Sequence, residues 1–481
     1  MFSFIIKTVP LIFIFLSAGF LSAEGIAPAV LPENRETVLA LDYRSSISIG
    51  ISNSFDLKEI RARESVYDLS IYENLREYFP SLTFSYLQTE ESRRRESDDR
   101  ESRLTVETEF PVYDGGRRGL NYDVAKLNSL LARNDYRIAL NQLMVSIRGE
   151  YLNLLKLRET VTINGQAFER GQMQLTFIQK EFELGDATKL SVLEIEAKVR
   201  EIELSLRQSE NDYNSALKKF KLLLRIGRNV PVEIKGDIDK DFVFFPVKGL
   251  IDEELISIAL KRRKEIESSD VKYEISRLNN LINEQYYLPN VSLGFNYNLT
   301  GEDFPPREKG WGVNLKITSR AFGNSMSAGT GYTESGNGNS RGRSRNASFD
   351  LLNDTPYKRN ILESRLEAAR ASDERTFTRE TIAIDVSVSC SAMCDSWDMI
   401  GIAGKRLELY DSQLEIERLK AEMGESRRYD LLEKEIERRD AAISLLDSKI
   451  KYLMAASDLE LSVGMDVDFL RNYMKEKGAG K

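Results

Sequence analysis

Histidine and cysteine, which provide most nucleophile pairs and transition-metal ligands, are absent or rare in this chain. The chain has 481 residues, with two cysteines and no histidine. Without histidine, Ser-His and Cys-His nucleophile pairs are excluded, and the commonest transition-metal ligand is missing. Cys390 and Cys394 lie four residues apart in a helical stretch. They could bind a soft metal, form a strained bridge, or pack as small core side chains.

Charged residues are abundant, but they form no catalytic motif. The sequence has neither a G-x-S-x-G nucleophile elbow nor a phosphate-binding P-loop. We therefore expect no enzyme activity, no cofactor and no resident metal. With 76 acidic and 68 basic side chains the formal charge is -8, a balance that disfavours nucleic acid as the main partner.

The N-terminal residues 1–23 contain one early lysine, an apolar run and small residues at the end. This pattern is typical of a secretory signal peptide. Since no other segment approaches ~18 consecutive apolar residues, we expect an exported protein without a membrane helix.

Four stretches alternate between apolar and polar residues, and they lie in two pairs. The first pair is 81–89 with 103–110, and the second is 290–300 with 311–318. Strands of about ten residues with one apolar face are typical of β-barrels that span a bilayer. Four strands are too few to close a barrel, and an open edge has no hydrogen-bond partners in lipid. The missing strands must come from other copies of the chain.

The hairpins predicted at 81–110 and 290–318 belong to an internal repeat. Tyr78-Phe79-Pro80 recurs as Tyr287-Leu288-Pro289, and Phe182–Gly185 recurs at Ala421–Gly424 with a larger offset. We divide the mature chain into repeats at 24–246 and 247–470, with a C-terminal tail at 471–481. The larger offset indicates an insertion at 323–349, whose Gly, Ser, Asn and Arg content predicts a flexible, solvated loop.

Each hairpin lies between helical segments. Short helices are predicted around 57–77 and 253–286, long helices at 120–182 and 356–420, and returning helices at 188–224 and 426–461. Gly185 and Gly424 supply the turns between the long and the returning helices, at 183–187 and 422–425. Two apolar stripes on a returning helix indicate neighbouring helices on both sides, as in a ring of helices, whereas an ordinary antiparallel bundle explains one stripe.

This order of elements, given twice, resembles the TolC family of outer-membrane channel proteins. The matching motifs are Leu39–Asp42, Phe79–Leu82, Phe110–Gly116, Phe182–Gly185 and Gly424–Glu433. The resemblance implies an α+β membrane protein, a homotrimer whose chains each give four strands to a 12-stranded β-barrel. A long periplasmic α-helical barrel of coiled-coil helices would continue it. The implied location is the outer membrane, in contact with its lipid and extending into the periplasm.

The resemblance also implies a function. The chain would be the passive exit duct of a tripartite efflux or type I secretion system, fed by an inner-membrane transporter through a periplasmic adaptor. A secreted coiled-coil scaffold or adaptor without a pore is the alternative, but it does not explain the four strands. The loops at 90–102 and 298–310 should face the cell exterior, and the insertion should lie near the base of the barrel.

Finally, the resemblance implies a gate, because acidic residues just past the second-half glycine line the periplasmic tip in this family. By motif position these are Asp430 and Glu433, and three copies would form a ring of six carboxylates that favours cations. The first half has Ser191 and Glu194 at the equivalent positions. Alternatively, Asp430 and Glu433 only stabilise the start of a helix, where negative charge is favourable.

Overall fold

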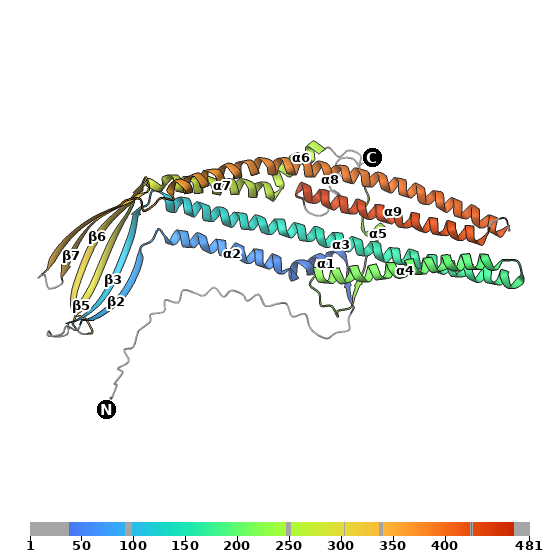
Figure 1. The fold of residues 1–481 in the computed structure, drawn as a ribbon, viewed down its shortest axis with the longest axis horizontal. Coiled ribbons are helices and arrows are strands. Elements are labelled where there is room, and N and C mark those ends of the chain that lie inside the picture. The colour runs from blue at the N-terminus through green and yellow to red at the C-terminus, as the bar shows by residue number, and fades with distance from the viewer. Residues whose placement is uncertain are drawn as a thin grey trace, which may run out of the picture.

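The molecule is elongated, with a β-sheet at one end and long helices along the rest of its length (Figure 1). The computed structural model describes residues 38–91, 99–246, 252–302, 304–335, 340–423, 425 and 427–465. The predicted signal peptide at 1–23, the tail at 471–481 and Gly424 lie outside these residues.

The described part of the sheet has six strands, each antiparallel to its neighbours, in the order β2-β3-β5-β6-β7-β8. They span Ser81–Glu91, Asp99–Tyr113, Asn290–Gly301, Glu308–Ala321, Asn324–Ser335 and Arg341–Asp350, respectively. The first four lie where the alternating pattern predicted strands. β3 pairs with β5, from Ser102 opposite Gly301 to Tyr113 opposite Val291, so the two halves of the chain share one sheet.

One face of the sheet is apolar and the other is polar. Large apolar side chains are exposed on the first face, namely Leu82, Phe84, Tyr86, Phe110, Leu293, Phe295, Trp311, Val313, Ile317, Met326 and Phe349. On the opposite face, asparagine side chains lie over glycines of the neighbouring strand. Asn296 covers Gly312 and Asn314 covers Gly294, where a Cβ atom on the glycine would collide with the amide. The asparagine side chains of the polar face therefore pack tightly against the glycines of the neighbouring strands.

The prediction that the insertion at 323–349 is a flexible loop is wrong. It forms β7 and β8, which extend the sheet beyond β6, so the described part of the chain has six strands in this sheet rather than four. Its small residues belong to the polar face, where Asn346 covers Gly329 as Asn296 covers Gly312. The alternation of the two strands was not visible in the composition. Glycine and serine occupy one face of these strands, and both residue types are also common in loops.

This added hairpin also spans the height of the sheet instead of lying at its base. Its far end lies beside the start of β6, since Ser335 pairs with Gly310. At the base the two ends of the insertion meet, because the Asp354 N–H donates to the carbonyl of Gly323 at 3.1 Å. As a result α8 (Tyr357–Glu422) begins close to the end of β6 despite the insertion.

Long helices run from the sheet to the far end of the molecule. α3 (Arg117–Leu184) has 68 residues, so at 1.5 Å per residue it is about 100 Å long. α8 has 66 residues. α4 (Lys189–Leu223) and α9 (Arg428–Val463) return beside α3 and α8. All four agree closely with the predicted helical segments.

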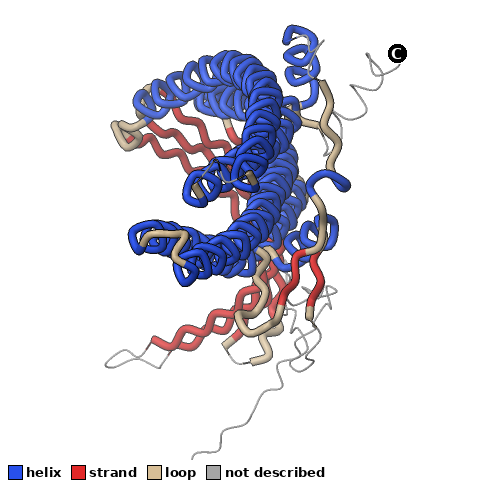
Figure 2. The backbone as a smooth tube through the Cα atoms, turned by 90° about the vertical axis from the view of Figure 1, so that its right-hand side faces the viewer, coloured by secondary structure: helices blue, strands red, loops and turns tan. Residues whose placement is uncertain are grey.

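Shorter elements complete the helical part. They are α1 (Tyr43–Asn53), α2 (Phe55–Arg76), α5 (Ile238–Asp241), α6 (Asp252–Arg262), α7 (Lys264–Glu284), the 3-10 helix η1 (Gln285–Tyr287) and the paired strands β1 (Leu39–Leu41) and β4 (Val232–Ile234). Seen along the long axis, the helices form an open, curved layer (Figure 2). None of the helices in the described part of the chain combines the length and the apolar composition that a membrane crossing requires.

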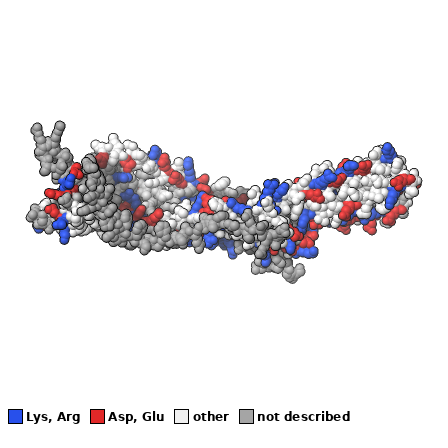
Figure 3. Space-filling model, turned by 90° about the horizontal axis from the view of Figure 1, so that it is seen from below, with Lys and Arg blue, Asp and Glu red and all other residues white. Residues whose placement is uncertain are grey.

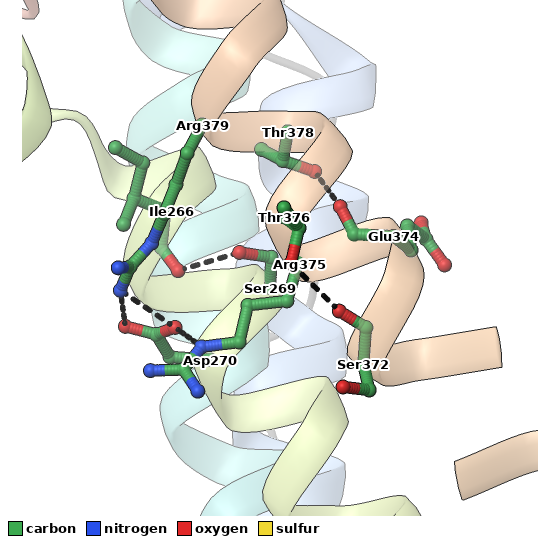
Figure 4. Close-up of polar contacts among 9 residues, drawn as sticks. All are labelled: Ile266, Ser269, Asp270, Ser372, Glu374, Arg375, Thr376, Thr378 and Arg379. Atoms are coloured by element: carbon green, nitrogen blue, oxygen red, sulfur yellow. Dashed lines mark hydrogen bonds and ion pairs between the residues drawn. The ribbon is translucent and has the colours of Figure 1, made fainter. Parts of the chain in front are cut away.

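A charged cluster fixes α7 against α8. Asp270 of α7 accepts hydrogen bonds from Arg375 and Arg379 of α8, the latter at 3.3 Å to each carboxylate oxygen (Figure 4). The Arg375 guanidinium also lies 5.5 Å from the centre of the Tyr273 ring. Because these side chains are well exposed, each ion pair contributes at most about 1 kcal/mol. The cluster therefore orients α7 more than it stabilises the fold.

The main hydrophobic core lies midway along the helices, with Tyr151, Phe220 and Tyr452 among its largest buried side chains. Burial raises the pKa of Tyr151 to about 12. Cys390 packs in this core without a disulfide bond to Cys394, and burial raises the pKa of the Cys390 thiol to about 12 as well. Across the described residues, no three His, Cys, Asp or Glu side chains group closely enough to hold a metal ion. Of the interpretations of this pair, core packing fits the structure.

Candidate functional site at the helical tip

The end of the molecule farthest from the sheet is formed where α3 turns into α4 and α8 turns into α9 (Figure 1). Gly185 follows α3 with a φ of 88°, in the left-handed region that favours glycine. Its N–H donates to the carbonyl of Phe182 at 3.1 Å. Thr188 then caps α4, because its hydroxyl accepts the N–H of Ser191 at 3.1 Å. The first turn is thus closed by local hydrogen bonds at both helix ends.

The second turn is built differently. α8 ends at Glu422 and α9 begins at Arg428, while Gly424 lies outside the described residues. Beside it, the Glu425 N–H donates to the carbonyl of Lys420 at 2.9 Å and closes the last turn of α8. No side-chain hydrogen bond caps α9 at its N-cap residue, Arg427.

The predicted gate residues lie just beyond this turn, three positions apart on one side of α9. Asp430 is half-buried and belongs to the first helical turn, and Glu433 is exposed. In the first half, Ser191 is engaged with the Thr188 cap and Glu194 is exposed. Negative charge at Asp430 also suits the helix dipole. The gate and the helix-start interpretations of Asp430 and Glu433 both stay predictions.

One ion pair that the sequence analysis missed joins the two turns. Arg428 donates to Glu181 Oε1 from Nη2 at 2.9 Å and from Nε at 3.1 Å. The guanidinium also lies 5.3 Å from the centre of the Phe177 ring. An arginine in the first turn of a helix is disfavoured by the helix dipole. A cation in this position favours an acidic partner nearby, but the sequence does not identify which residue that is.

Further along α9, Glu435 is buried and lies 3.5 Å from Arg418 of α8. Burial raises the pKa of Glu435, and the opposing effects of Arg170 and Arg418 do not cancel it. On the neighbouring turn, Leu432 packs into a small core that also contains Ile195 of α4. The start of α9 is therefore attached to α3 and α4 as well as to α8.

The surface of the helical part carries both signs of charge. Acidic and basic side chains are interspersed along it as far as the tip (Figure 3). In the single chain the tip therefore has no dominant charge in this view. A strongly acidic site would have to form where copies of the same few carboxylates come together.

Comparisons with known proteins place this architecture in a defined class. The family model described as outer membrane efflux protein matches residues 47–224. The outer membrane channel CmeC of Campylobacter jejuni has the same fold, with a TM-score of 0.73 and 15% identity, over 90% of this chain and 88% of that chain. The outer membrane protein VceC of Vibrio cholerae gives 0.72 and 12%, over 88% and 96%. The open-state outer membrane channel MtrE of Neisseria gonorrhoeae gives 0.70 and 12%, over 88% and 89%.

No curated protein sequence matches the chain. At these low identities the solved structures show a shared fold, and the family model adds a sequence match within the first half. The fold is that of the outer-membrane efflux channels. The predicted resemblance to the TolC family is confirmed on both grounds.

Proposed function

We propose that this chain forms a channel in the outer membrane that extends into the periplasm and serves as the passive exit duct of an efflux or secretion system. The main support is the exposed apolar face of the sheet. The sheet is followed by helices about 100 Å long. Lipid solvates such a face, whereas water does not. The opposite, polar face would line the aqueous interior.

The single chain is an incomplete wall, and we propose that a homotrimer completes it. β2 and β8 are open edges of the described sheet, and their unpaired backbone groups would lack partners in lipid. The open layer of helices has two edges in the same way (Figure 2). The number three is supported by the resemblance to the TolC family.

A passive duct depends on partners that supply energy and substrate. The family resemblance supports an inner-membrane transporter and a periplasmic adaptor that deliver the substrate to the helical end. A coiled-coil scaffold without a pore is the second candidate. The exposed apolar sheet face argues against it, since a soluble scaffold has no use for such a surface.

The tip is the proposed gate. Three copies would bring Asp430 and Glu433 together as a ring of six carboxylates that attracts cations. The pair of Glu181 and Arg428 would hold α9 against α3 in the closed arrangement. In this proposal, opening moves α9 relative to α3 and breaks the ion pair.

A mass measurement on the protein purified in detergent tests the proposal. We expect three chains per particle, and loss of solubility when detergent is removed. A stable monomer that remains soluble without detergent would overturn the channel and favour the scaffold.

A further inference from the structure

We propose that all six strands enter the barrel, so that β8 of one copy pairs with β2 of the next and three copies close a barrel of 18 strands (three times six). The inference rests on the proposed trimeric channel and adds which strands form its seam. It makes the insertion a part of the channel wall.

The free edges of the sheet support this seam. The outer edge of β6 is already occupied, because it pairs with β7 from Gly310 opposite Ser335 to Ala321 opposite Asn324. β2 and β8 remain as the open edges, with 11 and 10 residues. In a sheet of six antiparallel strands the first and last strands run in opposite directions. The β8 strand of one copy therefore meets the β2 strand of the next in the antiparallel sense.

The register of the sheet predicts which residues meet at the seam. Successive pairing across the sheet brings Leu82 of β2 level with Arg343 of β8. The strand ends nearest the helices are Ser81 in β2 and Asp350 in β8; Leu82 lies one residue from its end and Arg343 lies seven from its own. If these two ends meet at the seam, β8 is shifted along β2 by six residues, and this shift is the offset. An even offset keeps the apolar faces of two copies on the same side. The resulting seam pairs are Leu82–Phe349, Phe84–Ala347, Tyr86–Arg345, Gln88–Arg343 and Glu90–Arg341.

These pairs are chemically complementary. Arg341, Arg343 and Arg345 occupy alternate positions of β8, on the apolar face that also carries Phe349. Arginine on a lipid-facing position is costly unless it finds a partner. Across the seam, the arginines would face a carboxylate, an amide oxygen and a tyrosine ring, each of which accepts a guanidinium.

The hydrogen bonds that these side chains make within one chain are compatible with this pairing. Arg341 donates to Glu334 at 3.1 Å, and Glu90 accepts from Arg100 at 2.8 Å. Joining Glu90 of the next copy to Arg341 would place these two pairs side by side as a ladder of alternating charge. For Arg343 and Arg345, the described residues of the same chain provide no hydrogen bond or ion pair.

The polar face of the added hairpin favours the same arrangement. Asn346 covers Gly329 on β7 and β8, as Asn296 covers Gly312 on β5 and β6. A barrel closed at β6 would leave this polar face outside the aqueous interior, against lipid, where unpaired amides are costly. Within an 18-stranded wall it lines the interior together with the polar face of the other strands.

Cysteine cross-linking in the assembled protein tests the seam. In a background with Cys390→Ala and Cys394→Ala, the seam variant carries Phe84→Cys with Ala347→Cys. The comparison variant carries Phe84→Cys with Ile317→Cys, the pair that would meet if β6 formed the seam with the same offset. A short bifunctional thiol reagent is applied to the detergent-purified particle, and the products are separated in denaturing gels.

We expect the Phe84 and Ala347 variant to shift from the monomer band to dimer and trimer bands, with no shift for the comparison variant or for either single cysteine. A second seam pair, Leu82→Cys with Phe349→Cys, decides the result if Phe84→Cys prevents assembly. If trimers form but only the comparison variant cross-links, or none does, the seam is wrong and the channel stands. If no trimer forms in the unmodified protein, the proposed trimeric channel is itself wrong.

Discussion

Arg428, at the start of α9, donates two hydrogen bonds to Oε1 of Glu181, near the end of α3, although the two residues are 247 positions apart in the sequence. Each side chain is about one-third exposed, at 29% and 34%. The pair connects the two helical turns of the tip within one chain. Movement of one turn away from the other would break it, so in the proposed gate this contact would oppose opening.

We therefore predict that Arg428→Ala favours the open channel. A partly exposed ion pair contributes about 0.5–1 kcal/mol, which corresponds to roughly a two- to fivefold change in the ratio of open to closed states for each subunit. Single-channel recordings in planar bilayers measure this ratio. Arg200→Ala is the matched control, since Arg200 pairs with Glu196 on its own helix. Equal open fractions in both variants would show that the ion pair does not hold the channel closed.

Replacing both Asp430 and Glu433 with alanine should weaken the preference for cations and reduce block by multivalent cations. The reason is that the proposed gate of the proposed trimer would lose six carboxylates. Reversal potentials in asymmetric salt measure the preference. Ser191→Ala with Glu194→Ala changes the equivalent positions of the first half and should have little effect. If conductance, selectivity and block all stay unchanged, the helix-start interpretation of Asp430 and Glu433 stands.

A buried ion pair between α3 and α9 should matter for stability. Arg148 Nη1 lies 2.9 Å from Glu460 Oε2, with both side chains less than 10% exposed. Removing one partner leaves an uncompensated buried charge, so we expect Glu460→Ala to cost about 3–5 kcal/mol. Thermal unfolding in detergent should show a lower midpoint. The double variant Arg148→Met with Glu460→Met should recover most of the loss, and no recovery would mean that the pair itself supplies the stability.

Glu435 should make stability depend on pH. Burial raises its pKa in the folded protein, so its contribution is full below the unfolded-state pKa of about 4.3 and is lost as pH rises through the raised folded value. We expect Glu435→Gln to raise the unfolding temperature at neutral pH and to flatten its pH dependence in the weakly acidic range. Glu437→Gln, on the same helix, is the control. A lower midpoint for Glu435→Gln at neutral pH would show that the contact with Arg418 outweighs burial.

The sequence predicted the long elements well because each has a strong period. α3 and α4 follow a helical repeat without proline, and their ends agree with the predicted segments to within a few residues. β5 and β6 alternate large apolar and small polar residues, so their period of two is visible. The β7–β8 hairpin has the same period, but its polar face is mostly glycine, serine and asparagine. Its composition therefore resembled that of a linker.

The candidate site could be predicted only in part. Motif position placed Asp430 and Glu433 near a turn, and the structure has them in the first turns of α9. The partner of Arg428 could not be predicted, because the contact with Glu181 depends on how two helix pairs pack at their far ends. The burial of Glu435 was hidden for the same reason, since α9 has buried residues on more than one side.

Single-channel recording of the purified protein in a planar bilayer tests most directly the proposal that this chain conducts solutes through a membrane. We predict discrete ion-conducting steps that favour cations and that Arg428→Ala prolongs. A trimer that inserts into the bilayer but never conducts, under any voltage or salt and with Arg428→Ala in place, would contradict the claim.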